Sequence, residues 1–501
     1  MKGNSTMKRP NILVFMTDQQ RSDSINKAIM PNVERFRKEA LTFTNSYTVA
    51  PHCCPSRATF FSGLYPSQHG VWNNVKFNNT LSRGLYEGVR LFSEDLKESG
   101  YRMYFSGKWH VSVMESPKHR GFDVLHEPVP KPGKQAKYMI GDIEKVEYRH
   151  TQPPTNHWNL YNDFVQRKME DRGEGEIIRN GYPPYVLYGN QEDIFQDDDV
   201  VADAVADLRT MEKSDEPWFY YIGTLGPHDP YYVPDKYLDM YDINDIELPK
   251  SFYDDMRDKP NMHRRVRDLF AQLSEQEHKE AIRHYLAFCT HQDELFGQVL
   301  DALEERGEAD NTIVIFMSDH GDYTAEHGLW CKGLPCFKGA YHVPTLIRWP
   351  AGIRQPGRDV DAFISLADFA PTFVDVAQAE CDTAFAGKSI TPFFRGETPE
   401  DWADELYTQS NGNELYGIQR SVMTPEWKYV YNGYDYDELY DLRNDPDEMV
   451  NQANNPEYQG IAKELSKKIW KFAKKNDDVC IHPYIFCGLA SYGPGVIYDE
   501  T

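Results

Sequence analysis

Five short apolar runs, each followed by polar residues, constrain the fold of this 501-residue chain most strongly. The run at 11–17 is continuous, and a run of this length bounded by charge is typical of a strand buried on both faces of a parallel sheet. The other runs lie at 103–107, 218–224, 312–317 and 344–350, with helices expected between them at 31–41, 93–99, 198–208 and 278–306. This alternation predicts an α/β fold with a large doubly wound mixed sheet flanked by helices.

The character of the sequence changes twice along the chain. Residues 115–196 contain few periodic apolar runs and many Pro, Gly and Tyr residues, which predicts long ordered loops. Beyond about residue 396, short runs at 405–409, 417–423 and 428–431 predict antiparallel strands, and 457–474 predicts a helix. We therefore expect a catalytic domain at 1–398 and a smaller α+β domain at 399–501.

The composition argues against several classes of function. A net charge of −24, from 54 basic and 78 acidic side chains, disfavours nucleic-acid binding. No secretory signal is visible at residues 1–17, and no apolar run is long enough to span a membrane. Eight cysteines in a chain of this size do not make a disulfide scaffold, so we expect a cytoplasmic protein. Export through a removed leader or a non-classical route is the alternative.

Polar side chains suited to metal binding or acid–base chemistry follow four of the predicted strands. They are Asp18, Lys108 with His110, His228, and Asp319 with His320. Open α/β sheets bind ligands at the carboxyl ends of their strands, so these side chains are expected to share one site. Carboxylate ligands suit Ca²⁺, Mg²⁺ or Mn²⁺. The alternatives are a helix cap for Asp18 and core histidines for His110 and His228. Cys331 and Cys336 lack a second pair at zinc-ligand spacing, which argues against a zinc knuckle.

Between two of these strands lies an unusual stretch, Cys53-Cys54-Pro55-Ser56-Arg57, and residues 58–61 after it predict the start of a buried helix. Adjacent cysteines do not readily pair with each other, and the proline stiffens the backbone. A thiol at a helix N-terminus beside an arginine is reactive, because both surroundings favour the thiolate. The alternative is that both cysteines are small buried fillers.

This stretch, together with Gly63, resembles the Cys-x-Pro-Ser-Arg signature of the type I, formylglycine-dependent sulfatases of the alkaline phosphatase superfamily. The first cysteine of that signature is Cys53. Further segments resemble the family pattern in the same order: 11–18, 107–110, 226–228, 318–321, Lys332 with 343–344, and 439–442. The resemblance covers nearly the whole chain and implies a sulfuric-ester hydrolase.

The resemblance also implies a role for each matching residue. Cys53 would be oxidised to formylglycine (3-oxoalanine) by a formylglycine-generating maturation enzyme, and the hydrated aldehyde would attack sulfur while bound to a metal. The implied metal site holds one divalent ion, Ca²⁺ in preference to Mn²⁺ or Mg²⁺, and consists of Asp18, Gln19, Cys53, Asp319 and His320. The resemblance implies three further catalytic roles. Arg57 and Lys108 would fix the hydrate, and His228 and Lys332 would bind the sulfate and protonate the leaving oxygen. His110 would accept the proton whose removal lets sulfate leave.

Two departures from the common sulfatase pattern leave the substrate open. Asp18-Gln19 and Asp319-His320 resemble choline sulfatases and phosphonate monoester hydrolases of the same superfamily, whereas Lys108-Trp109-His110 is closer to ordinary sulfatases. We therefore expect hydrolysis of a sulfated sugar or another small organic sulfate. Phosphonate monoester or phosphodiester hydrolysis is the first alternative, and non-catalytic binding of sulfated ligands is the second. Lys338 stands where an acid is common, and the sequence offers no account of it.

Substrate contacts and assembly are less constrained. Aromatic and basic residues of the irregular region either bind a sulfated saccharide or only pack the loops: Tyr148, Arg149, His150, His157, Trp158 and Tyr161. The tail at 480–501 is too apolar to stay free in water without cost. We predict that it packs near the cleft, on the large domain or on a second subunit of a homo-oligomer. The alternative is a strap on the small domain alone.

Overall fold

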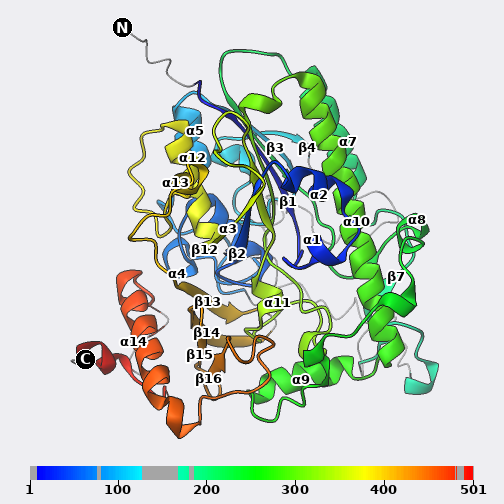
Figure 1. The fold of residues 1–501 in the computed structure, drawn as a ribbon, viewed down its shortest axis with the longest axis vertical. Coiled ribbons are helices and arrows are strands. Elements are labelled where there is room, and N and C mark those ends of the chain that lie inside the picture. Colours follow the sequence, from blue (N-terminus) through cyan, green and yellow to red (C-terminus); the bar gives the residue numbers. More distant parts are fainter. Residues whose placement is uncertain are drawn as a thin grey trace, which may run out of the picture.

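A computed structural model describes residues 8–75, 80–126, 168–179, 185–413, 415–479, 481 and 490–499. A mixed sheet of eight strands forms the centre of the larger part (Figure 1), in the order β12-β2-β11-β10-β1-β8-β3-β4. Its strands are β1 (Asn11–Thr17), β2 (Leu41–Tyr47), β3 (Arg102–Gly107), β4 (Asp123–His126), β8 (Trp218–Gly223), β10 (Thr312–Ser318), β11 (Thr345–Arg348) and β12 (Arg358–Ser365). The predicted fold class is therefore confirmed.

The register of the central strands brings the predicted polar residues to one edge of the sheet. β1 pairs in parallel with both β10 and β8, and Thr17 lies opposite Ser318. The residues that follow, Asp18 and Asp319, therefore leave the sheet side by side. β3 pairs in parallel with β8, which brings Lys108 to the same edge. β11 runs antiparallel to β10 and makes the sheet mixed.

Helices cover both faces of the sheet (Figure 1). One face packs against α2 (Pro31–Arg37), α7 (Asp197–Thr210) and α10 (Glu275–Arg306), and the other against α3 (Cys53–Ser62), α5 (Phe92–Glu98) and α12 (Phe369–Ala377). Leu13 and Phe15 of β1 join the first core, whereas Val14 and Met16 join the second. Burial on both faces explains why this run carries no polar alternation.

Several strands were missed in the sequence, and each has a local reason. The helix predicted for 31–41 ends at Arg37, and Leu41 instead begins β2, because pairing with β12 and β11 overrides the helical periodicity. β4 lies inside the region predicted as loops. β4 and β12 are the two edge strands, and their partly exposed, polar positions interrupt the apolar pattern.

The smaller part contains a four-stranded antiparallel sheet and a long helix. The elements are β13 (Leu406–Gly412), β14 (Tyr416–Met423), β15 (Trp427–Asn432), β16 (Glu438–Asp441) and α14 (Gln459–Lys475). Three of the strands and the helix were predicted, and the domain boundary at 398/399 stays a prediction. Lys338 begins α11 (Lys338–Tyr341), and its backbone N–H donates to Glu448 Oε2 at 3.0 Å, which ties the two parts together.

The described part of the C-terminal tail lies on α14. Trp470 Nε1 donates to the Tyr492 carbonyl at 2.7 Å, and Lys467 Nζ donates to the Asp499 carbonyl at 2.8 Å. Residues 490–499 therefore lie on the small domain, as the alternative states, and packing of the tail near the cleft stays a prediction. Assembly through the tail stays a prediction, and the six candidate substrate contacts at 148–161 lie outside the described residues.

None of the helices in the described part of the chain is long and apolar enough to cross a membrane. The cytoplasmic location stays a prediction.

The strand end that carries Lys108 depends on a glycine. Gly107 has a φ of +91°, and a Cβ there would lie 2.0 Å from the Gly223 carbonyl oxygen. We expect Gly107→Ala to lower the free energy of unfolding by more than about 3 kcal/mol, since it adds a backbone clash to the strain of positive φ. Gly100→Ala is the matched control, because Gly100 has a φ of +93° but a Cβ there would lie 3.7 Å from the nearest atom, Nη2 of Arg9. Urea unfolding of both variants measures the difference, and equal losses would contradict the clash.

Candidate active site

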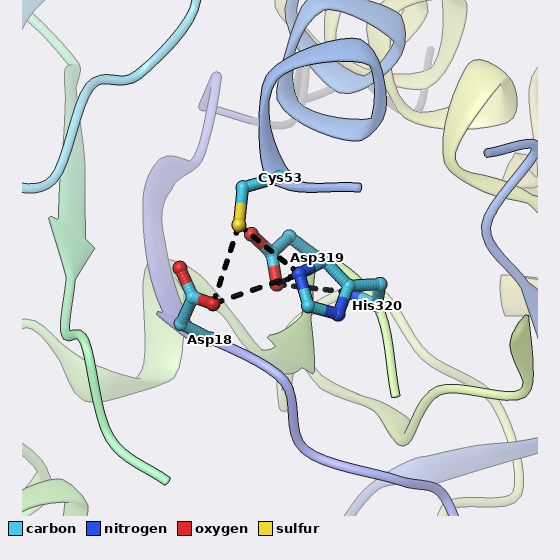
Figure 2. A group of neighbouring side chains, drawn as sticks. All are labelled: Asp18, Cys53, Asp319 and His320. Atoms are coloured by element: carbon cyan, nitrogen blue, oxygen red, sulfur yellow. Dashed lines mark hydrogen bonds and ion pairs between the residues drawn. The ribbon is translucent and has the colours of Figure 1, made fainter. Parts of the chain in front are cut away.

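Four side chains from three elements converge at the carboxyl edge of the large sheet (Figure 2). Asp18, Cys53, Asp319 and His320 each offer one ligand atom, and these atoms all lie within 4.8 Å of one another. Cys53 Sγ lies 3.2 Å from His320 Nε2 and 3.6 Å from Asp18 Oδ1. All four side chains are fully buried. The prediction that these strand ends meet beside Cys53 matches this geometry.

Backbone hydrogen bonds hold the two aspartates and the histidine in this arrangement. The Asp319 N–H donates to the Thr17 carbonyl at 3.2 Å, and Asp319 Oδ1 accepts from the His320 N–H at 2.8 Å. His320 Nδ1 lies 2.9 Å from the Gly321 carbonyl, so this nitrogen carries the hydrogen and Nε2 turns its lone pair to the cluster. Burial lowers the pKa of His320, which keeps the imidazole neutral and able to bind a metal.

The two adjacent cysteines have different surroundings. Cys53 is the first residue of α3, and its sulfur enters the polar cluster. Cys54 lies in the hydrophobic core, where its sulfur accepts from the Val75 N–H at 3.4 Å. The filler role considered for both cysteines therefore fits Cys54 only. Arg57 lies one helical turn after Cys53, so both side chains reach the same side of α3.

Arg57 and Lys108 compensate the buried carboxylates. Arg57 Nε donates to Asp319 Oδ2 at 2.8 Å and Nη2 donates to Asp18 Oδ2 at 3.1 Å. Lys108 Nζ also contacts Asp18 Oδ2. Burial would raise the pKa of the Asp18 carboxyl, but the surrounding cations, of which Lys108 is the strongest, hold it well below its usual range. Asp18 thus stays charged although it lies beside a second carboxyl group in the interior.

A second group of residues joins the cluster through Gln19. Gln19 Oε1 accepts from Lys332 Nζ, and Gln19 Nε2 donates to Asp229 Oδ1 at 3.2 Å and to Asp322 Oδ2. Lys332 Nζ lies 2.6 Å from His228 Nε2, so these two predicted residues meet. Burial would lower the pKa of Lys332, but electrostatic interactions with Cys53 and Asp229 hold it above its usual range. The amide oxygen of Gln19 is therefore directed to Lys332 rather than to the four clustered groups.

His110 lies two residues beyond Lys108 at the same strand end. It is buried, and its φ is +54°. It is not one of the four clustered groups. The predicted site residues thus lie at this edge of the sheet, in the adjoining loops or in the first turns of α3, and Figure 2 shows the four that face one another.

Two supporting residues escaped the sequence analysis. Tyr221 OH accepts from Arg57 Nη1 at 2.6 Å, but the residue lies inside an apolar run and resembles an ordinary core tyrosine. Asp322 accepts from Tyr231 OH at 2.6 Å and from Gln19. The sequence does contain a signal for Asp322, because this residue lies in the polar segment after β10 that also contains Asp319.

A cavity of about 770 Å³ adjoins these residues. His52, His228 and Lys332 line it, and Asn413 and Leu415 of the small sheet's first hairpin reach it from the other side. The cavity therefore lies between the two parts of the chain, and its volume is within the range of about 300–1,000 Å³ that is usual for small-molecule sites.

Comparison with known proteins decides the family. Residues 10–379 match the sequence model of the family described as sulfatase. The chain belongs to the sulfatase family. Residues 325–475 also match the model described as the C-terminal region of N-sulphoglucosamine sulphohydrolase. The resemblance inferred from the motifs is confirmed, and this sulfatase is a hydrolase of sulfuric esters.

Individual relatives cover most of the sulfatase. An arylsulfatase of Clostridium perfringens is 28% identical over 461 residues, which is 87% of this chain and 89% of the relative. An N-acetylglucosamine-6-O-sulfatase of Bacteroides thetaiotaomicron is 26% identical over 88% of this chain and 82% of the relative. The solved phosphonate monoester hydrolase of Agrobacterium radiobacter has a TM-score of 0.74 at 22% identity, covering 93% of this chain and 96% of its own, and it shares the fold.

Proposed function

We propose that this sulfatase hydrolyses sulfate monoesters of saccharides, with a formylglycine formed from Cys53 as its nucleophile. The observation that carries the proposal is the position of Cys53 Sγ, which faces Asp18 and His320 in a buried polar cluster. The similarity to an N-acetylglucosamine-6-O-sulfatase supports a sulfated sugar as substrate. The adjoining cavity is large enough for a sugar unit.

Residue 53 would act after modification. A maturation enzyme would oxidise the carbon that bears Sγ to an aldehyde, and water would hydrate it to a diol. Because Sγ lies within 3.6 Å of both Asp18 Oδ1 and His320 Nε2, a hydroxyl on this carbon would lie among the same groups. One hydroxyl would attack sulfur and displace the ester alcohol, which leaves a sulfated diol. His110 would then accept the proton of the other hydroxyl, so that sulfate leaves and the aldehyde returns.

The clustered donors fit a divalent metal ion. Two carboxylates and the lone pair of a neutral imidazole lie within 4.8 Å of one another and of residue 53. Hard oxygen donors favour Ca²⁺, with Mn²⁺ or Mg²⁺ as alternatives. When bound, such an ion would supply Lewis-acid polarisation of the reacting oxygens. Asp18, Asp319 and His320 would hold it, whereas Gln19 would first have to release Lys332.

Lys332 and His228 would act on the substrate. They line the cavity and contact each other, so an ester sulfate entering the cavity would meet a buried ammonium group and an imidazole together. His228 Nδ1 lies 2.6 Å from the Asp229 carbonyl, which fixes the ring, while Nε2 contacts Lys332 Nζ. Lys332 would bind the sulfate, and His228 would protonate the ester oxygen that departs.

A phosphonate monoester or phosphodiester hydrolase on the same scaffold is the second candidate. The Asp18-Gln19 and Asp319-His320 pairs and the shared fold with a phosphonate monoester hydrolase favour it. The sulfatase relatives and the Lys108-Trp109-His110 segment favour sulfate.

The substrate class is tested on protein that was co-expressed with a formylglycine-generating enzyme. Mass spectrometry of the tryptic peptide 39–57 should find formylglycine at position 53. We expect kcat/KM for nitrophenyl sulfate and sugar sulfates to exceed that for a phenyl phosphonate ester.

Cys53→Ala should lower kcat roughly 10³-fold or more, while the matched Cys54→Ala should keep most activity. Full activity with an unmodified thiol, or a preference for the phosphonate, would refute the proposal.

The proton donor is tested by varying the leaving group. Nitrophenolate departs without protonation, but a sugar hydroxyl does not, so His228→Ala should lower kcat/KM for a sugar sulfate by roughly 10²-fold or more and for nitrophenyl sulfate far less. His119→Ala, away from the cavity, should change neither. Equal losses on both substrates would remove the acid role and leave only binding.

A further inference from the structure

One wall of the substrate cavity is a single face of a helix that the mechanism does not use. This helix is α9 (Asn261–Phe270), which lies beside the small sheet (Figure 1). Four residues of α9 that line the cavity follow the spacing i, i+3, i+4 and i+7, so they lie on one face of the helix: Met262, Arg265, Val266 and Leu269. The face is therefore apolar with one cation, and it shares the cavity with Lys332 and His228.

Arg265 has no acidic partner on this wall. Its side chain is exposed and makes no hydrogen bond or ion pair with any residue that the structure describes. Several exposed arginines elsewhere in the described part of the chain do pair with acids: Arg35 with Asp301, Arg37 with Asp359, and Arg209 with Glu305. In a chain of net charge −24, a cavity-lining guanidinium without a carboxylate partner is available to an anion from outside the protein.

Lys332 and Arg265, two of the cationic side chains that line the cavity, differ in depth. Lys332 is partly buried and bonded to His228 and Gln19, whereas Arg265 is exposed. Trp330, Val266 and Leu269 supply apolar surface in the same cavity. A ligand complementary to these side chains would carry one anionic group that binds Lys332, a ring that packs on the apolar surface, and a second anionic group that binds Arg265. A second arginine, Arg179, also lines the cavity.

We infer that the substrate of this sulfatase carries a second anionic group besides the sulfate that is cleaved, and that Arg265 binds it. The inference rests on the proposed function and narrows its substrate class to saccharide sulfates with a further sulfate or a carboxylate. A sulfate and a carboxylate each accept two parallel hydrogen bonds from the planar guanidinium group of an arginine. Arg265 thus acts in substrate selection and not in the chemical step.

The kinetic test uses pairs of sugar sulfates that differ only in a second sulfate or carboxylate. The wild-type enzyme should cleave the doubly anionic member with the higher kcat/KM. Arg265→Gln should lower that value roughly tenfold, corresponding to 1.4 kcal/mol, mainly through KM, and leave the singly sulfated member within about twofold. Arg265→Lys should recover part of the loss. The control is Arg264→Gln, whose arginine bonds Asn261 on the same helix and does not line the cavity.

A binding test does not depend on turnover. Cys53→Ala protein should bind the doubly anionic sugar more tightly in titration calorimetry, and Cys53→Ala with Arg265→Gln should lose that preference. Equal loss on both members of a pair, or no loss, would overturn the inference, and so would a wild-type enzyme that cleaves sulfates but prefers the singly charged sugar. A formylglycine-bearing enzyme that cleaves no sulfate ester would instead overturn the proposed function and this inference with it.

Discussion

Two carboxylates that are buried side by side determine the rest of this structure. Asp18 and Asp319 follow adjacent parallel strands in matched register, so neither can move away from the other. Two like charges in the interior would take up protons unless cations matched them. Arg57 bonds both and Lys108 contacts one, so the pair is neutralised within the protein. The start of α3 follows from this requirement, because Arg57 must reach both carboxylates from within its second turn.

The same arrangement prepares the site for an anionic substrate. The carboxylates are already matched by two cations, so a divalent ion bound among them would leave the cluster with a net positive charge. Lys332 adds a further cation beside His228, and Arg265 adds one on the cavity wall. The protein as a whole carries a net charge of −24, yet its cavity collects positive groups, which would concentrate sulfate esters at residue 53.

The sequence predicts the centre of the fold better than its edges. β1, β8 and β10 were found because strands buried on both faces are continuously apolar, and the polar residues after them necessarily share an edge. The edge strands β4 and β12 carry polar, exposed positions, so only their pairing identifies them. Tyr221 and the bond from Lys332 to Gln19 depend on contacts between distant segments that no local pattern encodes. The tail is a similar case, since Val496 and Ile497 pack with Trp470 of α14 and only that contact shows which of the two alternatives holds for 490–499.

Calcium binding measured together with stability tests the central claim most directly. The account predicts one Ca²⁺ per wild-type chain and a rise in the free energy of unfolding of about 2.7 kcal/mol at a hundredfold excess over Kd. Asp319→Asn should lose both effects, while Asp359→Asn, which alters an exposed pair with Arg37, should keep them. Wild-type protein that binds no divalent ion, or an Asp319→Asn variant that binds it unchanged, would contradict the assignment of Asp18, Asp319 and His320 as a metal site.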